Sequence, residues 1–202
     1  ATLGGTGIII GATTIAAGSI HTAGTSVTAA ASAATLGKET FTHSSGITYS
    51  QGSIFEWNLT ANTETSIGTR GLDYDAVNTA ALATSGTKAI FRVVLNGTQD
   101  FSEEFWNTNR TWSDIFTNVA GGTSHDIAAI FTNTVEYWNS GGVVTGVPNT
   151  QGSFTITGSS LTWAAVPEPT GALASLLIAA GLLCRRRPGW RVSHPRSGRG
   201  GR

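Results

Sequence analysis

Sulfur and charge are scarce in this chain of 202 residues. It contains one cysteine, no methionine and only two lysines, and 12% of its residues are charged. The lone Cys184 excludes an intramolecular disulfide, so no cystine framework can hold the fold together. So few charged side chains provide little material for salt-bridged helices. The abundant Gly, Ala, Ser, Thr and Asn instead favour strands and tight turns.

The charge that is present is distributed unevenly. Residues 1–166 hold eleven acids and five bases, whereas residues 167–202 hold seven arginines and one acid, Glu168. A mildly acidic body with a strongly basic end suits an extracellular body and a cytoplasmic terminus. Because the body has no basic patch, nucleic acid is not expected as a partner.

The first residues show no export signal. The sequence begins at Ala1, and no charged segment followed by an apolar one is present there. If the protein is exported, we expect a longer precursor that carries this signal.

One stretch near the C-terminus joins a helix breaker, an apolar segment and a block of positive charge. Val166-Pro167-Glu168-Pro169 precedes fourteen uncharged residues, 171–184, and these precede Arg185-Arg186-Arg187. Proline is tolerated at the first helical position but not in a helix interior, so we predict a helix over residues 169–184. The segment is apolar on nearly all sides, and arginine resists entry into hydrocarbon. We therefore expect a membrane helix that ends at the arginines, on the cytoplasmic side.

The length of this segment leaves an alternative open. Fourteen helical residues span roughly 21 Å, against roughly 30 Å for the hydrocarbon core of a bilayer. An apolar run of this length also fits a helix packed in a soluble core. The triple arginine argues against that alternative, because no acid nearby in the sequence would neutralise it.

The order of these parts resembles the PEP-CTERM sorting signal of secreted bacterial proteins, which is also labelled the ice-binding protein C-terminal domain. The resemblance covers residues 166–187. It implies export, transient anchoring in the inner membrane, and recognition by a membrane transpeptidase called exosortase. That enzyme cuts near the motif and releases or re-attaches the protein at the cell surface. The resemblance also makes Pro167, Glu168 and Pro169 the recognition residues, with Val166 opening the motif.

The chain departs from this pattern after the arginines. Members of the family usually end within a few residues, whereas residues 188–202 add four more arginines and no acid. We expect these residues to form a disordered basic tail.

The first fifty residues predict short strands. Isolated apolar residues recur every five to nine positions between glycines and threonines, and no helical period fits them. This spacing is typical of the rungs of a parallel β-solenoid, in which each rung covers the apolar residues of the one before. A disordered Gly/Ser/Thr linker is the alternative for this part.

After residue 52 the strands are predicted from clearer patterns of apolar residues. Phe55, Trp57 and Leu59 alternate with polar residues, which indicates a half-buried strand over residues 53–60. Other strands are expected at residues 79–82, 88–95, 128–131 and 134–138, and over 153–165 with a turn at Gly158-Ser159. Residues 101–117 do not show this strand pattern, because their aromatic side chains are spaced nearly as on one face of a helix.

The fold class expected from these patterns is mainly β. We predict a parallel β-solenoid, with an antiparallel β-sandwich as the alternative. Residues 1–165 would form this body, with a short helical insertion at about 101–117 and a C-terminal hydrophobic helix. Residues 52–95 also resemble, more loosely, bacterial surface proteins with autotransporter-type β-solenoid repeats, which implies a surface location but no activity.

Residues that could carry chemistry are few. Asp73 and Asp75 would share one face of a strand and form a weak calcium candidate, and no other metal or cofactor is expected. Ser124, His125 and Asp126 are adjacent, so they cannot form a catalytic triad. Four glutamates could supply an acid pair only if the fold brought two of them together: Glu56, Glu103, Glu104 and Glu136. The tryptophans are expected to pack in the core.

These observations favour a non-enzymatic, exported protein of the bacterial cell surface or extracellular matrix. Exosortase and the inner membrane are the expected partners, with extracellular polysaccharide as a further candidate. One rival is a carbohydrate-binding or adhesive module, which would expose several of Trp57, Trp106, Trp112, Trp138 and Trp163 in a row. A second rival is a polysaccharide-active enzyme, which would need two carboxylates close together in a groove.

Overall fold

The computed structural model describes residues 1–24, 36–59, 62–95, 101, 103–133, 135–139, 142–145 and 152–166, with backbone only at 137–139 and 142–145. Residues Ala1–Pro167 form one unit, and Glu168–Arg202 belong to a second. The C-terminal hydrophobic helix and the basic tail predicted from the sequence lie outside the described residues.

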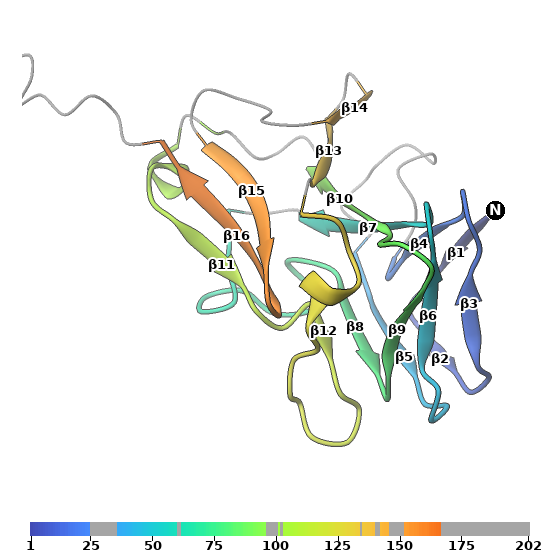
Figure 1. The fold of residues 1–202 in the computed structure, drawn as a ribbon. Helices are drawn as coiled ribbons and strands as arrows, with labels where there is room; N and C mark the ends of the chain where they lie inside the picture. Colours follow the sequence, from blue (N-terminus) through green and yellow to red (C-terminus); the bar gives the residue numbers. More distant parts are fainter. Residues whose placement is uncertain are drawn as a thin grey trace, which may run out of the picture. The chain divides into compact units, whose positions relative to one another are not determined.

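Most strands belong to three sheets of parallel strands, which we name A, B and C (Figure 1). Sheet A has the order β1-β4-β7-β10-β13-β14, sheet B the order β12-β8-β5-β2, and sheet C the order β3-β6-β9. Only the last pair of sheet A, β13 with β14, is antiparallel. The bounds are β1 Thr2–Gly4, β2 Ile8–Ile9, β3 Thr13–Ile15, β4 Ile20–Thr22, β5 Lys38–Phe41, β6 Ile47–Ser50, β7 Ile54–Leu59, β8 Ala76–Thr79, β9 Leu82–Ser85, β10 Ile90–Leu95, β12 Phe116–Thr117, β13 Glu136–Asn139 and β14 Gly142–Thr145.

The chain visits the three sheets in turn, which gives a solenoid-like repeat. The first rung is β1-β2-β3, the second β4-β5-β6 and the third β7-β8-β9. Successive rungs are in register in sheet A, where Ile20 pairs with Ile54 and Ile54 pairs with Ile90. Parallel pairing through three sheets agrees with the solenoid-like expectation and does not fit the antiparallel sandwich for this part of the chain.

Alternation along the strands builds the core between the sheets. On β7, Phe55 and Trp57 point into the interior, and Phe91 on β10 is the register partner of Phe55. The ring centroids of Phe55 and Phe91 are 5.4 Å apart, and those of Phe55 and Phe116 are 4.7 Å apart. Each buried ring contributes about 1.5–3 kcal/mol by leaving water, and such ring pairs add about 0.5–1.5 kcal/mol.

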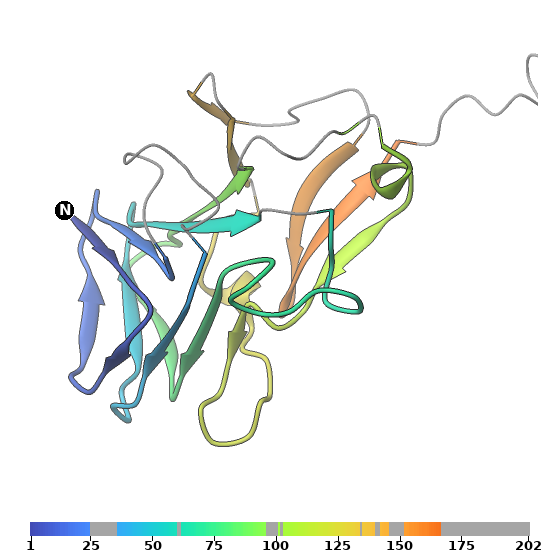
Figure 2. The same ribbon diagram turned by 180° about the vertical axis from the view of Figure 1, so that it is seen from behind.

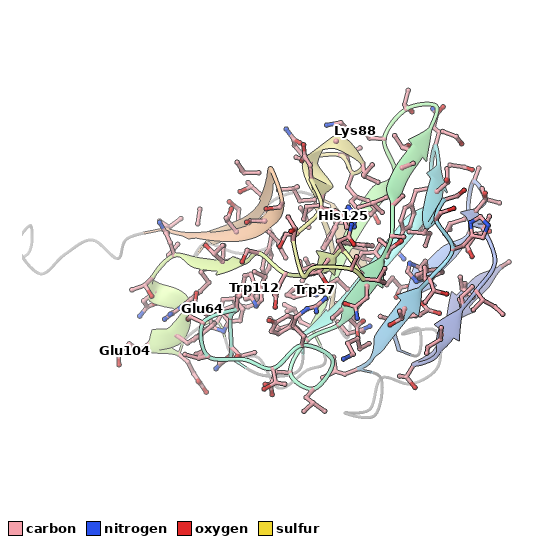
Figure 3. All side chains as sticks on the ribbon, turned by 90° about the horizontal axis from the view of Figure 1, so that it is seen from below. Trp57, Glu64, Lys88, Glu104, Trp112 and His125 are labelled. Atoms are coloured by element: carbon pink, nitrogen blue, oxygen red, sulfur yellow. The ribbon has the colours of Figure 1, made fainter. Side chains whose placement is uncertain are left out.

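A fourth sheet, D, is antiparallel and has the order β11-β16-β15, with β11 at Arg110–Trp112, β15 at Gly152–Thr157 and β16 at Ser160–Ala165 (Figure 2). Gly158, with φ of 57°, makes the turn between β15 and β16. Phe154, Trp106, Trp112 and Trp163 pack together against this sheet, and Trp112 also meets Trp57, with centroids 5.4 Å apart (Figure 3). Sheet D thereby continues the aromatic core of the parallel sheets.

Several strand predictions are confirmed. The expected strands at residues 53–60 and 88–95 correspond to β7 and β10, and the hairpin over 153–165 corresponds to β15 and β16. The expectation that residues 53–60 are half-buried is wrong, because Glu56 and Asn58 on β7 are fully buried as well. The region expected at 134–138 contains β13, which begins at Glu136. The short N-terminal strands also form, as β1 to β6.

Three local predictions are wrong. Residues 79–82 are not one strand, because they join the end of β8 to the start of β9. Residues 128–131 fall in and after a 3-10 turn, η3 (Ile127–Ala129), whose first turn is capped by the side chain of Asp126. The helical insertion at 101–117 is reduced to one 3-10 turn, η2 (Glu104–Asn107), followed by the strands β11 and β12.

Candidate functional site

A polar cluster inside the second rung is made of His21, Glu39 and Tyr49. Each of the three sheets supplies one member, because His21 lies on β4, Glu39 on β5 and Tyr49 on β6. His21 Nδ1 is hydrogen-bonded to the Tyr49 hydroxyl, and His21 Nε2 lies 2.7 Å from Glu39 Oε2. All three side chains are buried. We call this group the polar triad.

Burial, and secondly the charge of Glu39, raise the pKa of Tyr49 well above its ordinary value, so the hydroxyl keeps its proton. In the tautomer of His21 that carries its ring proton on Nε2, the hydroxyl donates a hydrogen bond to Nδ1, and Nε2–H donates one to Glu39. A tyrosine, histidine and glutamate joined in this way can hold or pass a proton.

Aromatic rings enclose the polar triad. The ring of His21 contacts Phe41 at 5.6 Å and Phe55 at 5.3 Å between centroids, and Tyr49 contacts Phe131 at 5.0 Å. His21 and Tyr49 have an exposed fraction of 0%, so no substrate can reach the reactive atoms in this structure. The cluster therefore supports the fold and its register, and it is not an accessible catalytic site.

A second buried cluster surrounds Asp75, next to the start of β8. Its carboxylate accepts hydrogen bonds from the backbone of Gly37 at 2.9 Å, from the backbone and side chain of Asn58 at 3.1 and 2.6 Å, and from the Thr22 hydroxyl at 3.3 Å. Burial raises the pKa of Asp75 to about 7, and these hydrogen bonds act in the opposite direction. The cluster connects segments of the second and third rungs.

The calcium candidate is not assembled by the fold. Asp75 is fully buried, whereas Asp73 lies in a turn and accepts from the backbone N–H of Thr69 at 2.7 Å. The two carboxylates therefore do not share one face of a strand. Within the described part of the chain, no group of three or more His, Cys, Asp or Glu side chains is placed to hold a metal ion.

Glu56 and Glu136, two of the four glutamates considered for an acid pair, both contact Arg92. Glu56, Arg92 and Glu136 are register partners on β7, β10 and β13. A nitrogen of Arg92 lies 2.9 Å from Glu136 and another 3.7 Å from Glu56. Because the guanidinium stands between the two carboxylates, it offsets one of their two negative charges, and the ladder does not provide an acid–base pair facing a groove. Glu103 and Glu104 are exposed elsewhere.

The adjacent Ser124, His125 and Asp126 serve local structure. Ser124 makes a β-bridge with Thr117, His125 Nε2 lies 2.9 Å from the carbonyl of Thr79, and Asp126 caps η3. Their side chains do not form a hydrogen-bonded triad in the described structure, as the sequence spacing predicts.

The four tryptophans whose side chains the structure describes lie inside the body. Trp57, Trp106, Trp112 and Trp163 are buried, and the first and third lie next to each other in the interior (Figure 3). The prediction that the tryptophans pack in the core is confirmed for these four. An adhesive face built on an exposed row of them is contradicted, and the side chain of Trp138 lies outside the described set.

The sorting motif begins where the described body ends. Val166 is 54% exposed and directly follows β16. Pro167, Glu168 and Pro169 lie outside the described residues, as do the predicted helix 169–184 and Arg185, Arg186 and Arg187. Among the helices that the structure describes, none has the length and apolar character needed to cross a membrane.

The sequence reasoning missed the polar triad and the Asp75 cluster. One signal was present for Glu39, which lies two residues before Phe41 and so shares its strand face. The same signal was present for Tyr49, which lies two residues after Ile47 on the same face of β6. For His21 no local pattern distinguishes an interior position from an exposed one. Comparison with known proteins gives no further identification, because no protein-family model, no curated protein and no solved structure matches this chain.

Proposed function

We propose that this is an exported protein of the bacterial cell surface or extracellular matrix, with a parallel β-solenoid body and a C-terminal PEP-CTERM-type sorting signal. The body has no enzymatic role in this proposal. The signal comprises Val166, Pro167, Glu168 and Pro169, the predicted helix 169–184, and the arginines at 185–187.

The position of the motif relative to the last strand carries the proposal. The backbone N–H of Ala165, the last residue of β16, donates to Asn109 Oδ1 at 3.0 Å, and Ala165 pairs with Gly152 on β15. The next residue, Val166, is exposed. In the sequence, Pro167-Glu168-Pro169 follows this exposed residue, which supports a cleavage site next to the end of the folded body.

The proposed mechanism assigns one task to each part of the signal. Pro167 and Pro169 favour extended backbone around Glu168, which suits entry into a peptidase site. The apolar helix would hold the exported chain in the inner membrane, and the arginines would fix its cytoplasmic end. A transpeptidase of the exosortase type would then cut near the motif and release or re-attach the body at the surface, where extracellular polysaccharide is a candidate partner.

The use of polar side chains in the body supports a non-enzymatic role. The polar triad is enclosed, Arg92 stands between Glu56 and Glu136 in the ladder, and the Asp75 carboxylate accepts its hydrogen bonds from groups within the fold. Each of these described clusters therefore has a structural task.

The test is the C-terminal mass of the protein recovered from its native host, measured together with cell fractionation. We expect a chain that ends between Val166 and Pro169, outside the cell or on its surface. The variant with Pro167 and Pro169 replaced by alanine should stay uncut in the inner membrane, whereas Pro188→Ala, a proline outside the motif, should be processed normally. An intact and freely soluble wild-type chain would refute the proposal.

A further inference from the structure

Residues 1–166 contain no sulfur. Methionine is absent from this chain, and its one cysteine, Cys184, lies further along. Thiol and thioether sulfur atoms are among the groups that oxidants attack most readily. Without them, the side chains of the body that lose an electron most easily are the rings of tryptophan and tyrosine. An oxidant that removes one electron from the body therefore leaves a radical on one of these rings.

Four buried tryptophans form a connected group of rings, in which Trp57 and Trp112 are the pair labelled in Figure 3. The ring centroids of this pair are 5.4 Å apart. Trp106 follows at 6.4 Å from Trp112, and Trp163 at 5.2 Å from Trp106. Each Nε1–H donates to a carbonyl oxygen, which is a poor base, so an oxidised ring keeps its proton. Electrons tunnel rapidly between rings this close, and a radical formed on one member can reach Trp57.

Phenylalanine rings connect this group to Tyr49 of the polar triad. The centroid of Phe91 is 6.4 Å from that of Trp57 and 5.4 Å from that of Phe131, and the centroid of Phe131 is 5.0 Å from that of Tyr49. All of these rings are buried. The phenylalanines are not oxidised themselves, but they keep water out and leave only a short distance for an electron to cross. An electron can therefore pass from Tyr49 to Trp57.

The polar triad provides the proton acceptor that an oxidised tyrosine requires. A phenol that has lost an electron is a strong acid, so its proton must leave in the same step. The Tyr49 hydroxyl is hydrogen-bonded to His21 Nδ1, which can take this proton when the ring carries its own on Nε2. Nε2 lies 2.7 Å from Glu39 Oε2, so the imidazolium that forms has a carboxylate beside it, which compensates its charge.

A second tyrosine, Tyr74, competes for the same step. Its ring lies closer to the tryptophans, with its centroid 5.9 Å from that of Trp57. Its hydroxyl, however, donates to the carboxylate of Asp114 at 2.9 Å and not to a histidine. Imidazole is ordinarily a stronger base than a carboxylate, so it takes up a proton more readily. Distance thus favours Tyr74, whereas the proton acceptor favours Tyr49.

We propose that Tyr49 is a redox-active tyrosine that receives oxidising equivalents from the buried tryptophans, with His21 as its proton acceptor. An inorganic one-electron oxidant outside the protein, such as the carbonate radical, takes the first electron from a tryptophan and becomes carbonate. The tryptophan radical cation then gains one electron from Tyr49, and the hydroxyl proton moves to His21 Nδ1. The products are a neutral tryptophan, a tyrosyl radical and an imidazolium paired with Glu39.

The enclosure of the polar triad suits this role. Only an electron and a proton move, so no substrate has to reach the interior, and the radical stays away from solvent. Hydrophobic side chains of similar volume would fill this space without a desolvation cost, so packing alone does not account for three polar groups in this order. This role would hold whether or not the chain is sorted to the cell surface.

The test follows radical transfer in the purified full chain, held in mild detergent, after azide radicals from pulse radiolysis have oxidised its tryptophans. Transient absorption distinguishes the tryptophan radical from the tyrosyl radical. The variant Tyr49→Phe is compared with its matched control Tyr74→Phe, because each removes one buried hydroxyl. We expect the tyrosyl signal to grow as the tryptophan signal decays in the wild type and in Tyr74→Phe. In Tyr49→Phe the tyrosyl signal should be lost, and the tryptophan radical should live longer.

Glu39→Gln gives a second readout, because glutamine keeps the volume and an oxygen acceptor for His21 but removes the charge. This variant should slow the growth of the tyrosyl signal severalfold, and the wild-type rate should fall in deuterated water. Circular dichroism checks that each variant is folded. The proposal would be overturned by a wild type without a tyrosyl signal, by a signal that persists in Tyr49→Phe or disappears in Tyr74→Phe, or by equal rates for Glu39→Gln and wild type.

Discussion

At the residue scale, the polar triad occupies positions that the adjacent rungs fill mainly with apolar side chains. His21 lies between Leu3 and Phe55 in the register of sheet A, and Glu39 pairs with Val77 in sheet B. Placing polar groups there has a desolvation cost, and their mutual hydrogen bonds offset it only while all three are present. The triad therefore marks the second rung as different from its neighbours.

This interdependence predicts non-additive mutations. Tyr49→Phe or Glu39→Val alone should lower the free energy of unfolding by about 1–3 kcal/mol, because each leaves a buried group of His21 unpaired. The triple variant His21→Leu, Glu39→Val and Tyr49→Phe should be close to wild type or more stable. Urea unfolding of the set measures this, and a triple variant as unstable as the sum of the single ones would contradict it.

Asp75 predicts a dependence of stability on pH. Its pKa is raised by burial from 3.8 to about 7, so the folded state binds a proton more tightly than the unfolded state. The stabilisation from this proton is fully present below the pKa of 3.8 that Asp75 has in the unfolded chain. Between the two values the unfolding free energy should fall as pH rises, by up to about 4 kcal/mol, and this stabilisation should be fully lost above pH 7.

The matched variant is Asp75→Asn, which cannot ionise. Its unfolding free energy should lack the Asp75 contribution, so the difference between wild type and variant should change steadily from pH 4 to pH 7 and then level off. Urea unfolding at several pH values measures the difference. Parallel curves over this range would show that Asp75 stays ionised in the folded protein.

At the scale of elements, a close approach between segments depends on Gly37, just before β5. A Cβ atom there would lie 1.8 Å from the carbonyl oxygen of Ala23 and 2.5 Å from a methyl of Thr6. Gly37 also donates its N–H to Asp75. The second rung can close only if this position has no side chain.

Gly37→Ala should therefore destabilise the body by more than the about 1–3 kcal/mol typical of overpacking, since the nearest atom is backbone. Gly7→Ala is the control, because its Cβ would meet nothing within 4 Å. Thermal unfolding followed by circular dichroism distinguishes the two. Equal midpoints for both variants would show that the backbone at Ala23 moves aside.

The strands that the sequence predicts well are those rich in aromatic and β-branched residues. On β7, Phe55 and Trp57 alternate with polar residues, although those polar residues are buried too, and on β10 the apolar content is high. The helix predicted for residues 101–117 is wrong because aromatic side chains from a 3-10 turn and from a strand pack in the same core. Their spacing in the sequence happens to match that of one helical face. The sorting motif could be identified from the sequence, and its role stays a prediction.

The polar triad could not be predicted, for a physical reason. His21 meets Glu39 and Tyr49 across 18 and 28 residues, respectively, through the pairing of three different sheets. Local patterns determine which face of a strand a side chain occupies, but not which side chain of another sheet stands opposite. The Asp75 cluster is similar, because its partners Thr22, Gly37 and Asn58 come from separate segments.

At the scale of the whole molecule, the stability of the body should not depend on the residues after Val166. β16 is the last strand of the body, and Leu161 and Trp163 on that strand are fully buried. Trp163 Nε1 also donates to the carbonyl of Trp106 at 2.9 Å. Cutting after this strand would leave the aromatic core intact, whereas cutting before it would open the core.

A chain that ends at Val166 should accordingly unfold with the midpoint of the full chain. A chain that ends at Ser159, which lacks all of β16, should lose more than the about 3–5 kcal/mol typical of a single Trp→Ala change in a core. Chemical unfolding of both truncations, followed by tryptophan fluorescence, measures this. A destabilised 1–166 chain would show that later residues support the body.

The uneven length of the rungs has a consequence for how this chain tolerates insertions and deletions. Among the parallel pairs of sheet A, register partners are closest in sequence between Thr2 and Ile20 and farthest apart between Arg92 and Glu136, yet the strands stay aligned. The corners therefore absorb changes in length, so added residues there should leave every interior side chain in place. One residue inserted within β7 would instead turn its aromatic side chains to the opposite face. Related sequences should thus diverge in length at the corners while their strands keep a constant length.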